Sequence, residues 1–336
     1  MLLHDLIGLS GLLFPLLAVA TKGSTGCNSV HPPLVIPGEP SQAIRFLTAH
    51  GGKRSFNLHI PAAYQAKEPV PLILAFHGKN QAPTTFENET QLSNPAFNDE
   101  AIVAFPQGVK EQWTGDPAAP PLSQVNDLLY TSDLLDYLQA THCIDLDRIY
   151  AYGFSNGGGL VDLLACNANL APRIAAFAAT SAAVYQDKAL KEPLFSLCPS
   201  RESPVPFLTF HGTSDPVIDY DGYRTSDGPS WPVQNRMQGW AERNGCPNGA
   251  ENSTIQLFGG KVQKYSWTCD DFEDVVVHYR IEGFGHGVPT TTPLDNDGQR
   301  YGPTFFNATP IVMDFFRAWP LPEPLPELSQ DTRDEL

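Results

Sequence analysis

The segment Gly153-Phe154-Ser155-Asn156-Gly157 constrains the fold of this chain more than any other. An apolar run precedes it, and two more glycines and the helical pattern of Leu160–Cys166 follow it. A serine on a sharp strand-to-helix turn takes a strained backbone conformation, and side chains two residues away would collide with the neighbouring strand or helix. The segment therefore predicts a strand, a tight turn that presents Ser155, and a helix. A glycine-rich turn with only a structural role is the competing interpretation.

The rest of the chain alternates short runs rich in Val, Ile, Phe and Tyr with helical patterns. This alternation is typical of an α/β fold with a mostly parallel sheet and helices on both faces. The expected strands are Leu72–Phe76, Ala101–Phe105, Arg148–Tyr152, Ala175–Ala179, Phe207–Phe210 and Val275–Ile281. The expected helices are Asp127–Gln139 with Asn126 or Asp127 as its cap, a helix from a Ser230 cap to Trp240, and Pro310–Trp319. Long loops are expected around residues 80–98, 114–125 and 286–304. No shift in composition divides the chain, so we expect one domain over residues 21–319.

Two residues are placed to act together with Ser155 at one edge of the sheet. A serine hydroxyl is a weak nucleophile until a base accepts its proton, and a carboxylate holds that base in the required tautomer. Asp215 lies in the turn after Phe207–Phe210, and His286 lies in a glycine-flanked loop after the next strand. We therefore predict Ser155 as the nucleophile, His286 as the base and Asp215 as the acid.

Other residues compete for two of these roles. Asp219 and Asp221 are rival candidates for the acid, and His278 is a rival for the base. His278 lies inside an expected strand, where a satisfied histidine of the core or surface is the commoner finding. We interpret His77 as a structural residue that orients the turn after its strand.

Acyl transfer also requires two N–H donors that face the developing oxyanion. We expect one to be the backbone N–H of Asn156, at the start of the helix after Ser155. We expect the other to be the backbone N–H of Lys79, in the turn after Phe76-His77-Gly78. Three aromatic residues in expected loops are candidates for lining a substrate pocket, or alternatively cap the core beneath those loops: Trp113, Tyr223 and Trp231.

Seven short motifs form a recognisable set: Ala75-Phe76-His77-Gly78, Phe105-Pro106-Gln107-Gly108, Trp113-Thr114-Gly115-Asp116-Pro117, Arg148-Ile149-Tyr150, Gly153 to Gly159, His211-Gly212-Thr213-Ser214-Asp215 and Gly285-His286-Gly287. From about Gly26 to Trp319 the chain resembles the fungal feruloyl esterases of the C type, which belong with the poly(3-hydroxybutyrate) depolymerase-like α/β-hydrolases. The resemblance implies a single-domain α/β-hydrolase fold with Ser155, Asp215 and His286 as the triad. It also implies a secreted serine esterase without a cofactor, which hydrolyses ferulate and related hydroxycinnamate esters of feruloylated plant cell-wall polysaccharide. Relatives often carry Trp after the last motif, whereas this chain has Val288, which leaves the preferred acyl group and sugar open.

Other functions remain open beside this one. An acetylxylan esterase and a depolymerase of short-chain polyesters such as hydroxybutyrate are the alternatives among enzymes. An inactive hydrolase-fold binding protein is the non-enzymatic alternative, and the presence of all three triad residue types argues against it. No zinc, phosphate-loop or dinucleotide motif is present, and the loop at Asp295-Asn296-Asp297-Gly298 lacks the ligands of a calcium site. We expect no metal and no cofactor.

The charge of the chain bears on its partners. A formal net charge of −16 repels phosphate backbones and anionic lipids, so neither nucleic acid nor a membrane is an expected partner. We expect a monomer.

The six cysteines predict three disulfides in an oxidising compartment, because their number is even and an expected signal peptide precedes them. Short loops favour Cys166–Cys198 and Cys246–Cys269, which leaves Cys27–Cys143 as the third pair. Three sequons agree with passage through the secretory pathway, and their asparagines are Asn88, Asn252 and Asn307.

The two ends of the chain suggest its destination. The apolar run from Leu6 to Ala20 ends in Ala18-Val19-Ala20 and predicts a signal peptide over residues 1–20, with a buried first helix as the alternative. Residues 320–336 form a proline-rich segment that we expect to be an extended tail. Its last residues, Arg333-Asp334-Glu335-Leu336, are close to a retrieval signal for the endoplasmic reticulum. Secretion is therefore the main expectation, and retention in that compartment is the second.

Overall fold

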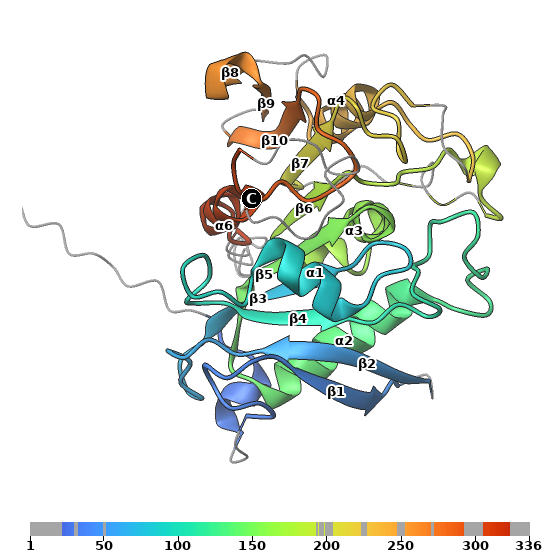
Figure 1. Cartoon of the computed structure of the whole chain (residues 1–336). Helices are drawn as coiled ribbons and strands as arrows, with labels where there is room; N and C mark the ends of the chain where they lie inside the picture. Colours follow the sequence, from blue (N-terminus) through green and yellow to red (C-terminus); the bar gives the residue numbers. More distant parts are fainter. Residues whose placement is uncertain are drawn as a thin grey trace, which may run out of the picture.

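The arrangement of strands explains how residues far apart in the sequence reach one edge of a sheet. A computed structural model of the chain describes residues 22–29, 33–49, 52–192, 194, 198, 204–222, 227–246, 253–269, 272–291 and 305–322. Within these ranges, ten strands form one sheet in the order β1-β2-β4-β3-β5-β6-β7-β10-β9-β8 (Figure 1). Their bounds are β1 Gln42–Leu47, β2 Lys53–His59, β3 Val70–Phe76, β4 Ile102–Pro106, β5 Ile144–Phe154, β6 Ala176–Thr180, β7 Phe207–Gly212, β8 Ser253–Leu257, β9 Val262–Cys269 and β10 Phe272–Ile281.

The centre of the sheet is parallel and its two sides are antiparallel. Neighbouring strands from β4 through β3, β5, β6 and β7 to β10 run in the same direction. On one side β2 runs antiparallel to β1 and β4, and on the other β9 runs antiparallel to β10 and β8. The carboxyl ends of the parallel strands therefore meet at one edge, which is where ligands bind in open α/β sheets.

Helices cover both faces of the sheet, as the alternating sequence pattern predicted. Their bounds are α1 Pro83–Thr90, α2 Asp127–Thr141, α3 Asn156–Cys166, α4 Val233–Arg243 and α6 Ala308–Ala318, with short 3-10 turns η1 Thr25–Asn28, η2 Ala171–Arg173, η3 Asp187–Ala189 and η5 Phe258–Gly260. Alternate strand residues point to opposite faces. Leu72 and Leu74 of β3 pack in one cluster with residues of α2, α3 and α4, whereas Ile73 and Ala75 pack in the other with residues of α1 and α6.

Several element predictions are confirmed, with shifted bounds. All six expected strands are present, and the helix expected over Asp127–Gln139 extends to Thr141. Asn126 is its cap, because the side chain of Asn126 accepts hydrogen bonds from the backbone N–H groups of Leu128 and Leu129. In the part of the chain that the structure describes, no helix is both long enough and apolar enough to cross a membrane.

Other element predictions are wrong. The region expected as a loop over residues 80–98 contains α1, which begins at Pro83, a residue suited to the first turn of a helix. Ser230 does not cap a helix; it forms a β-bridge with Tyr185, and α4 begins three residues later at Val233. Four strands were not predicted, and they are the antiparallel strands β1, β2, β8 and β9.

Three disulfides connect the described cysteines: Cys27–Cys143, Cys166–Cys198 and Cys246–Cys269. These are the three predicted pairs: loop length favoured the second and third, and the first was the pair that remained. Asn88 lies exposed on α1, and Asn307 precedes α6, where its Oδ1 accepts hydrogen bonds from Thr291. Asn252, the predicted signal peptide over residues 1–20 and residues 323–336 lie outside the described residues.

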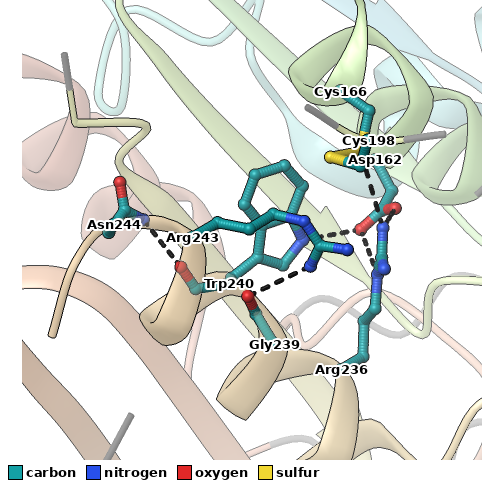
Figure 2. The surroundings of a disulfide bond; sticks show 8 residues. All are labelled: Asp162, Cys166, Cys198, Arg236, Gly239, Trp240, Arg243 and Asn244. Carbon is teal, nitrogen blue, oxygen red and sulfur yellow. Dashed lines mark hydrogen bonds and ion pairs between the residues drawn. A yellow bond between two sulfur atoms is a disulfide. The ribbon is translucent and has the colours of Figure 1, made fainter. Parts of the chain in front are cut away.

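A buried ion pair beside the second disulfide joins α3 to α4 (Figure 2). Arg236 of α4 donates hydrogen bonds from Nε and Nη2 to the carboxylate of Asp162 on α3, and its Nη2 lies 3.7 Å from Sγ of Cys166. The indole N–H of Trp240 donates to the same carboxylate at 2.8 Å. Asp162 is 1 % exposed and Arg236 7 % exposed, so the two charges neutralise each other away from water.

We expect Arg236→Met to lower the free energy of unfolding by about 3–5 kcal/mol, because it leaves the Asp162 carboxylate buried without its cation. Chemical denaturation of the purified full chain measures this change. Arg317→Met is the matched control: Arg317 pairs with Glu100 and Asp314 but its side chain is 46 % exposed, so the expected loss is below about 1 kcal/mol. Equal losses in the two variants would contradict the stabilising role of the buried pair.

Candidate active site

The backbone of Ser155 is strained, and neighbouring glycines make that strain possible. Ser155 lies between the end of β5 and the start of α3 with φ 52° and ψ −118°. A Cβ on Gly153 would lie 2.3 Å from the carbonyl oxygen of Gly157, and a Cβ on Gly157 would lie 2.2 Å from the carbonyl oxygen of Phe76. Both positions therefore accept only glycine, and the segment forms the sharp strand-to-helix turn that the sequence predicted.

The structure brings Ser155, His286 and Asp215 together in one line of hydrogen bonds. Nε2 of His286 lies 2.9 Å from Oγ of Ser155, and Nδ1 of His286 lies 2.8 Å from Oδ2 of Asp215. Ser155 follows β5, Asp215 follows β7 and His286 follows β10, so all three lie at the carboxyl edge of the parallel strands. Ser155 and Asp215 are each 7 % exposed, and His286 is 1 % exposed. With its Nδ1–H donated to Asp215, the imidazole presents the lone pair of Nε2 to the serine hydroxyl.

The Asp215 carboxylate is fixed by more donors than the sequence indicated. Oδ1 accepts the backbone N–H groups of Val217 and Ile218, each at 2.8 Å. Nε2 of His211 lies 3.3 Å from Oδ2, on the same oxygen as His286. Burial acts to raise the pKa of this carboxyl, but the hydrogen bonds with His211 and His286 outweigh it and hold the pKa well below its ordinary value. Asp215 is therefore ionised at neutral pH.

His211 is the residue of this site that sequence reasoning missed. It is the last residue but one of β7, and its Nε2 also lies 2.9 Å from the carbonyl oxygen of Ile218. The motif His211-Gly212 at the end of a strand was the available signal, because it places the imidazole four residues before Asp215. Its position beside the carboxylate suits a residue that orients the acid.

The rival acid and base occupy other positions. His278 is fully buried in β10, where Nδ1 lies 2.8 Å from the hydroxyl of Thr209 and Nε2 lies 2.9 Å from the hydroxyl of Tyr220. Burial, helped by the neighbouring His211 and Arg280, lowers the pKa of His278 to about 3. Oδ1 of Asp219 accepts the backbone N–H of Asp221, within an exposed turn. These contacts suit structural residues.

The two predicted oxyanion donors lie on segments that the fold holds against each other. Within the described residues, neither the backbone N–H of Lys79 nor that of Asn156 donates a hydrogen bond to the protein. The close approach of Gly157 to Phe76 brings the end of β3, and with it the turn that carries Lys79, to the start of α3. Both amides are thus available to an incoming oxygen atom.

Trp113 is buried in the core, which fits the interpretation that it caps the core rather than the interpretation that it lines a pocket. Its side chain is fully buried, and its indole N–H donates to the carbonyl oxygen of His77 at 2.8 Å. Its backbone N–H donates to Oδ1 of Asn156 at 2.7 Å, and its carbonyl accepts from Nδ2 of Asn156 at 3.1 Å. Trp113 therefore connects the segment that carries Lys79 to the segment that carries Asn156.

His77 fixes the turn that contains Lys79. Its Nδ1 donates to the carbonyl oxygen of Gly78 at 2.6 Å, and its Nε2 accepts the backbone N–H of Gly108 at 3.0 Å. Burial lowers the pKa of His77 to about 4, so the ring is neutral, as this pair of contacts requires. The contacts agree with the interpretation of His77 as a structural residue.

Trp231, another of the aromatic candidates, lies at the surface. Its side chain is 41 % exposed, and its backbone N–H donates to the carbonyl oxygen of Val184, in the segment after β6. Tyr223 lies outside the described residues. Val288, two residues after His286, is 2 % exposed and packs in the core.

A cavity of about 1340 Å³ lies at the opposite edge of the sheet, beneath α6. Residues at the starts of β5 and β10 line it, among them Asp145, Arg148, Phe272 and Asp274. It is therefore not the space in which Ser155 would meet a ligand. Among the described residues, no three His, Cys, Asp or Glu side chains are grouped as metal ligands.

Known proteins resemble this chain in sequence and in fold. No protein-family model matches the chain. Feruloyl esterase B of Piromyces equi is 31% identical over 211 residues, which cover 60% of this chain and 37% of that protein. A probable feruloyl esterase C of Aspergillus niger is 27% identical over 226 residues, which cover 66% of this chain and 71% of that protein. A bifunctional acetylxylan esterase/xylanase of Neocallimastix patriciarum is 25% identical over 232 residues, which cover 68% of this chain and 31% of that protein.

The solved structure of an acetyl xylan esterase from Aspergillus awamori superimposes with a TM-score of 0.54 at 13% identity, covering 74% of this chain and 96% of that one. The fold is thus that of the α/β-hydrolases, as predicted. By sequence the chain is a relative of the feruloyl esterases, as its motifs indicated, and these relatives are all named as esterases. The chain matches between 31% and 51% of the length of the first three curated relatives.

The buried histidines predict how stability depends on pH. Because His278 has a pKa of about 3 in the folded protein and about 6.5 when unfolded, only the unfolded chain takes up a proton between these values. Stability therefore falls as pH decreases below about 6.5, by about 1.4 kcal/mol per pH unit for this residue. We expect His278→Gln to reduce that slope by about this amount between pH 6 and 4, measured by denaturation at several pH values. Identical slopes in the variant and the wild type would contradict the assignment.

Proposed function

We propose that the chain is a carboxylic ester hydrolase in which Ser155, His286 and Asp215 form a catalytic triad. The observation that carries the proposal is the continuous line of hydrogen bonds from Asp215 through His286 to the hydroxyl of a strained, nearly buried Ser155. Two backbone N–H groups without acceptors in the described residues, those of Asn156 and Lys79, supply the oxyanion site that this chemistry needs.

In the proposed mechanism His286 first acts as a base. Nε2 of His286 accepts the proton of Ser155 while the serine oxygen attacks the ester carbonyl carbon. The carbonyl oxygen becomes an oxyanion, which the N–H groups of Asn156 and Lys79 bind. The ionised Asp215 stabilises the imidazolium, which then protonates the departing alcohol and leaves an acyl-enzyme. Water, deprotonated by His286, hydrolyses the acyl-enzyme and restores Ser155.

We propose a hydroxycinnamate ester of plant cell-wall polysaccharide, ferulate first, as the substrate. Support comes from the names of the relatives, which are feruloyl esterases B and C, and from the exposed ring of Trp231. Acetylated xylan is the second candidate, because one relative is an acetylxylan esterase/xylanase and because the buried Val288 offers no ring for an aromatic acyl group. No cofactor takes part in this proposal, and the proposed working form is a monomer.

We also propose that the protein works outside the cell. Its three disulfides persist in oxidising compartments, and this agrees with the predicted signal peptide. Retention in the endoplasmic reticulum through Arg333-Asp334-Glu335-Leu336 stays a prediction, because these residues lie outside the described part of the chain.

We expect Ser155→Ala to lower ester hydrolysis by about 10⁴-fold or more, because triad residues act as a unit. Rates on methyl ferulate, an acetylated xylan and short-chain nitrophenyl esters measure the loss and identify the preferred substrate. The matched control is Ser132→Ala on α2, where the hydroxyl accepts a hydrogen bond from Nη1 of Arg173 at 3.1 Å, and it should retain full activity. A Ser155→Ala enzyme with more than about a tenth of wild-type turnover would exclude Ser155 as the nucleophile.

We expect Trp231→Ala to raise KM for methyl ferulate about 3- to 10-fold with little change in kcat, as the loss of one aromatic contact would. KM for a nitrophenyl acetate should stay the same, because its acyl group carries no ring. Phe272→Ala is the control, since Phe272 is 44 % exposed but lies at the opposite edge of the sheet. An unchanged KM for methyl ferulate would remove Trp231 from the substrate site.

A further inference from the structure

The side chain of Lys79 is held by two carboxylates from separate loops. Nζ of Lys79 lies 3.1 Å from Oδ1 of Asp116 and 3.2 Å from Oδ2 of Asp227. Asp116 lies in the segment between β4 and α2, and Asp227 lies in the segment between β7 and α4. The hydroxyl of Tyr185, in the segment after β6, lies 3.5 Å from the same oxygen of Asp227. One ammonium group thus joins the loops that follow β3, β4 and β7, and Asp227 extends the contact to the segment after β6, at the edge that carries Ser155.

The carboxylate of Asp116 is buried and held by a second hydrogen bond. Its side chain is 1 % exposed, and its Oδ1 also accepts the backbone N–H of Ala118 at 2.7 Å. Lys79 and Asp227 are only partly exposed, with side-chain values of 25 % and 32 %. Burial acts to lower the pKa of Lys79, but the two carboxylates raise it above its ordinary value, so the ammonium is charged at neutral pH.

The backbone on both sides of the Lys79 amide is also fixed. The carbonyl of Gly78 accepts the Nδ1–H of His77, and the N–H of Asn80 donates to the carbonyl oxygen of Glu111 at 2.8 Å. These contacts fix the main chain before and after Lys79. The side chain of Lys79 adds a further attachment, because its Nζ pairs with Asp116 and Asp227.

We propose that the Lys79 side chain is a positioning group for the oxyanion site, an inference that rests on the proposed esterase function. Its ammonium, fixed between Asp116 and Asp227, sets the direction of the Lys79 backbone N–H. It also offsets two negative charges that would otherwise oppose an oxyanion bound by that N–H. With Lys79 the three side chains carry a net charge of −1, and without it they carry −2. The effect should appear in the transition state, where the oxyanion forms, rather than in substrate binding.

The test uses the full chain and three variants, each assayed on the ester that the wild type hydrolyses best. Lys79→Met keeps the backbone N–H and most of the side-chain volume, and we expect kcat to fall about 10-fold or more while KM changes less than about 3-fold. Lys79→Arg keeps the charge and should restore kcat to within about 3-fold of wild type. Lys264→Met is the matched control, because Lys264 pairs with Asp274 away from Ser155 and its loss should leave kcat unchanged.

A double variant separates positioning from stability. Lys79→Met leaves Asp116 buried without a cation, which by itself lowers Tm. Adding Asp116→Asn removes that charge and keeps the acceptor for Ala118, so Tm should recover while kcat stays low. Recovery of kcat together with Tm would show a merely structural role and overturn the proposal, and so would a change in KM alone.

Amide hydrogen exchange tests whether the Lys79 side chain holds the loops together, and it requires no enzymatic reaction. Lys79→Met should speed amide exchange in residues 78–81 and 114–119 relative to the wild type, whereas Lys264→Met should not. Unchanged exchange in both segments would overturn the proposed positioning role of the Lys79 side chain, even if the enzyme is active. A wild-type chain that hydrolyses no ester would instead refute the proposed function, and the exchange result would still decide whether Lys79 holds the loops.

Discussion

The strained conformation of Ser155 is the constraint on which the rest of the site depends. A non-glycine residue at φ 52° and ψ −118° persists only where the surroundings leave no alternative. The backbone of Ser155 is held by three hydrogen bonds: its N–H donates to Thr180, and its carbonyl accepts from Gly159 and Ala183. Gly157, pressed against the carbonyl of Phe76, then fixes the distance between β3 and α3. The glycine that permits the strained turn therefore also places the two proposed oxyanion segments together.

Four histidines lie at or near this edge, and their partners give them different roles. Among the described residues, His286 and His211 contact the carboxylate of Asp215, whereas His77 and His278 contact carbonyl, amide and hydroxyl groups. Burial without a paired carboxylate lowers the pKa of His77 to about 4 and of His278 to about 3. Such rings stay neutral and serve as fixed donors and acceptors. A base needs the opposite arrangement, a charged partner on one nitrogen and a hydroxyl on the other.

The sequence predicted the buried parallel strands and the meeting of Ser155, Asp215 and His286 at one edge of the sheet, because these depend on local patterns. Continuous apolar runs identify strands covered on both faces, and β3 is one example. Antiparallel β1 has mostly exposed or half-buried residues, so its sequence shows no such run. Helix α1 was missed because Phe86 is the one large apolar side chain that it buries. The role of Trp113 was also beyond prediction, since its position in a loop does not reveal that both its side chain and its backbone turn inward.

The two proposed oxyanion donors, Asn156 and Lys79, are fixed by different physical means. Asn156 is held by the core: its side chain forms two hydrogen bonds with the backbone of the fully buried Trp113, where water does not compete. Lys79 is partly exposed, in the turn after β3, where loops from separate strands meet at the carboxyl edge of the sheet. A long cationic side chain reaches two carboxylates there, as no apolar residue could. The pair with the buried Asp116 contributes to stability, whereas the pair with Asp227, which is 32 % exposed, contributes little. The second pair is therefore better explained by the proposed reaction at Ser155, because it ties a further loop to the proposed oxyanion site.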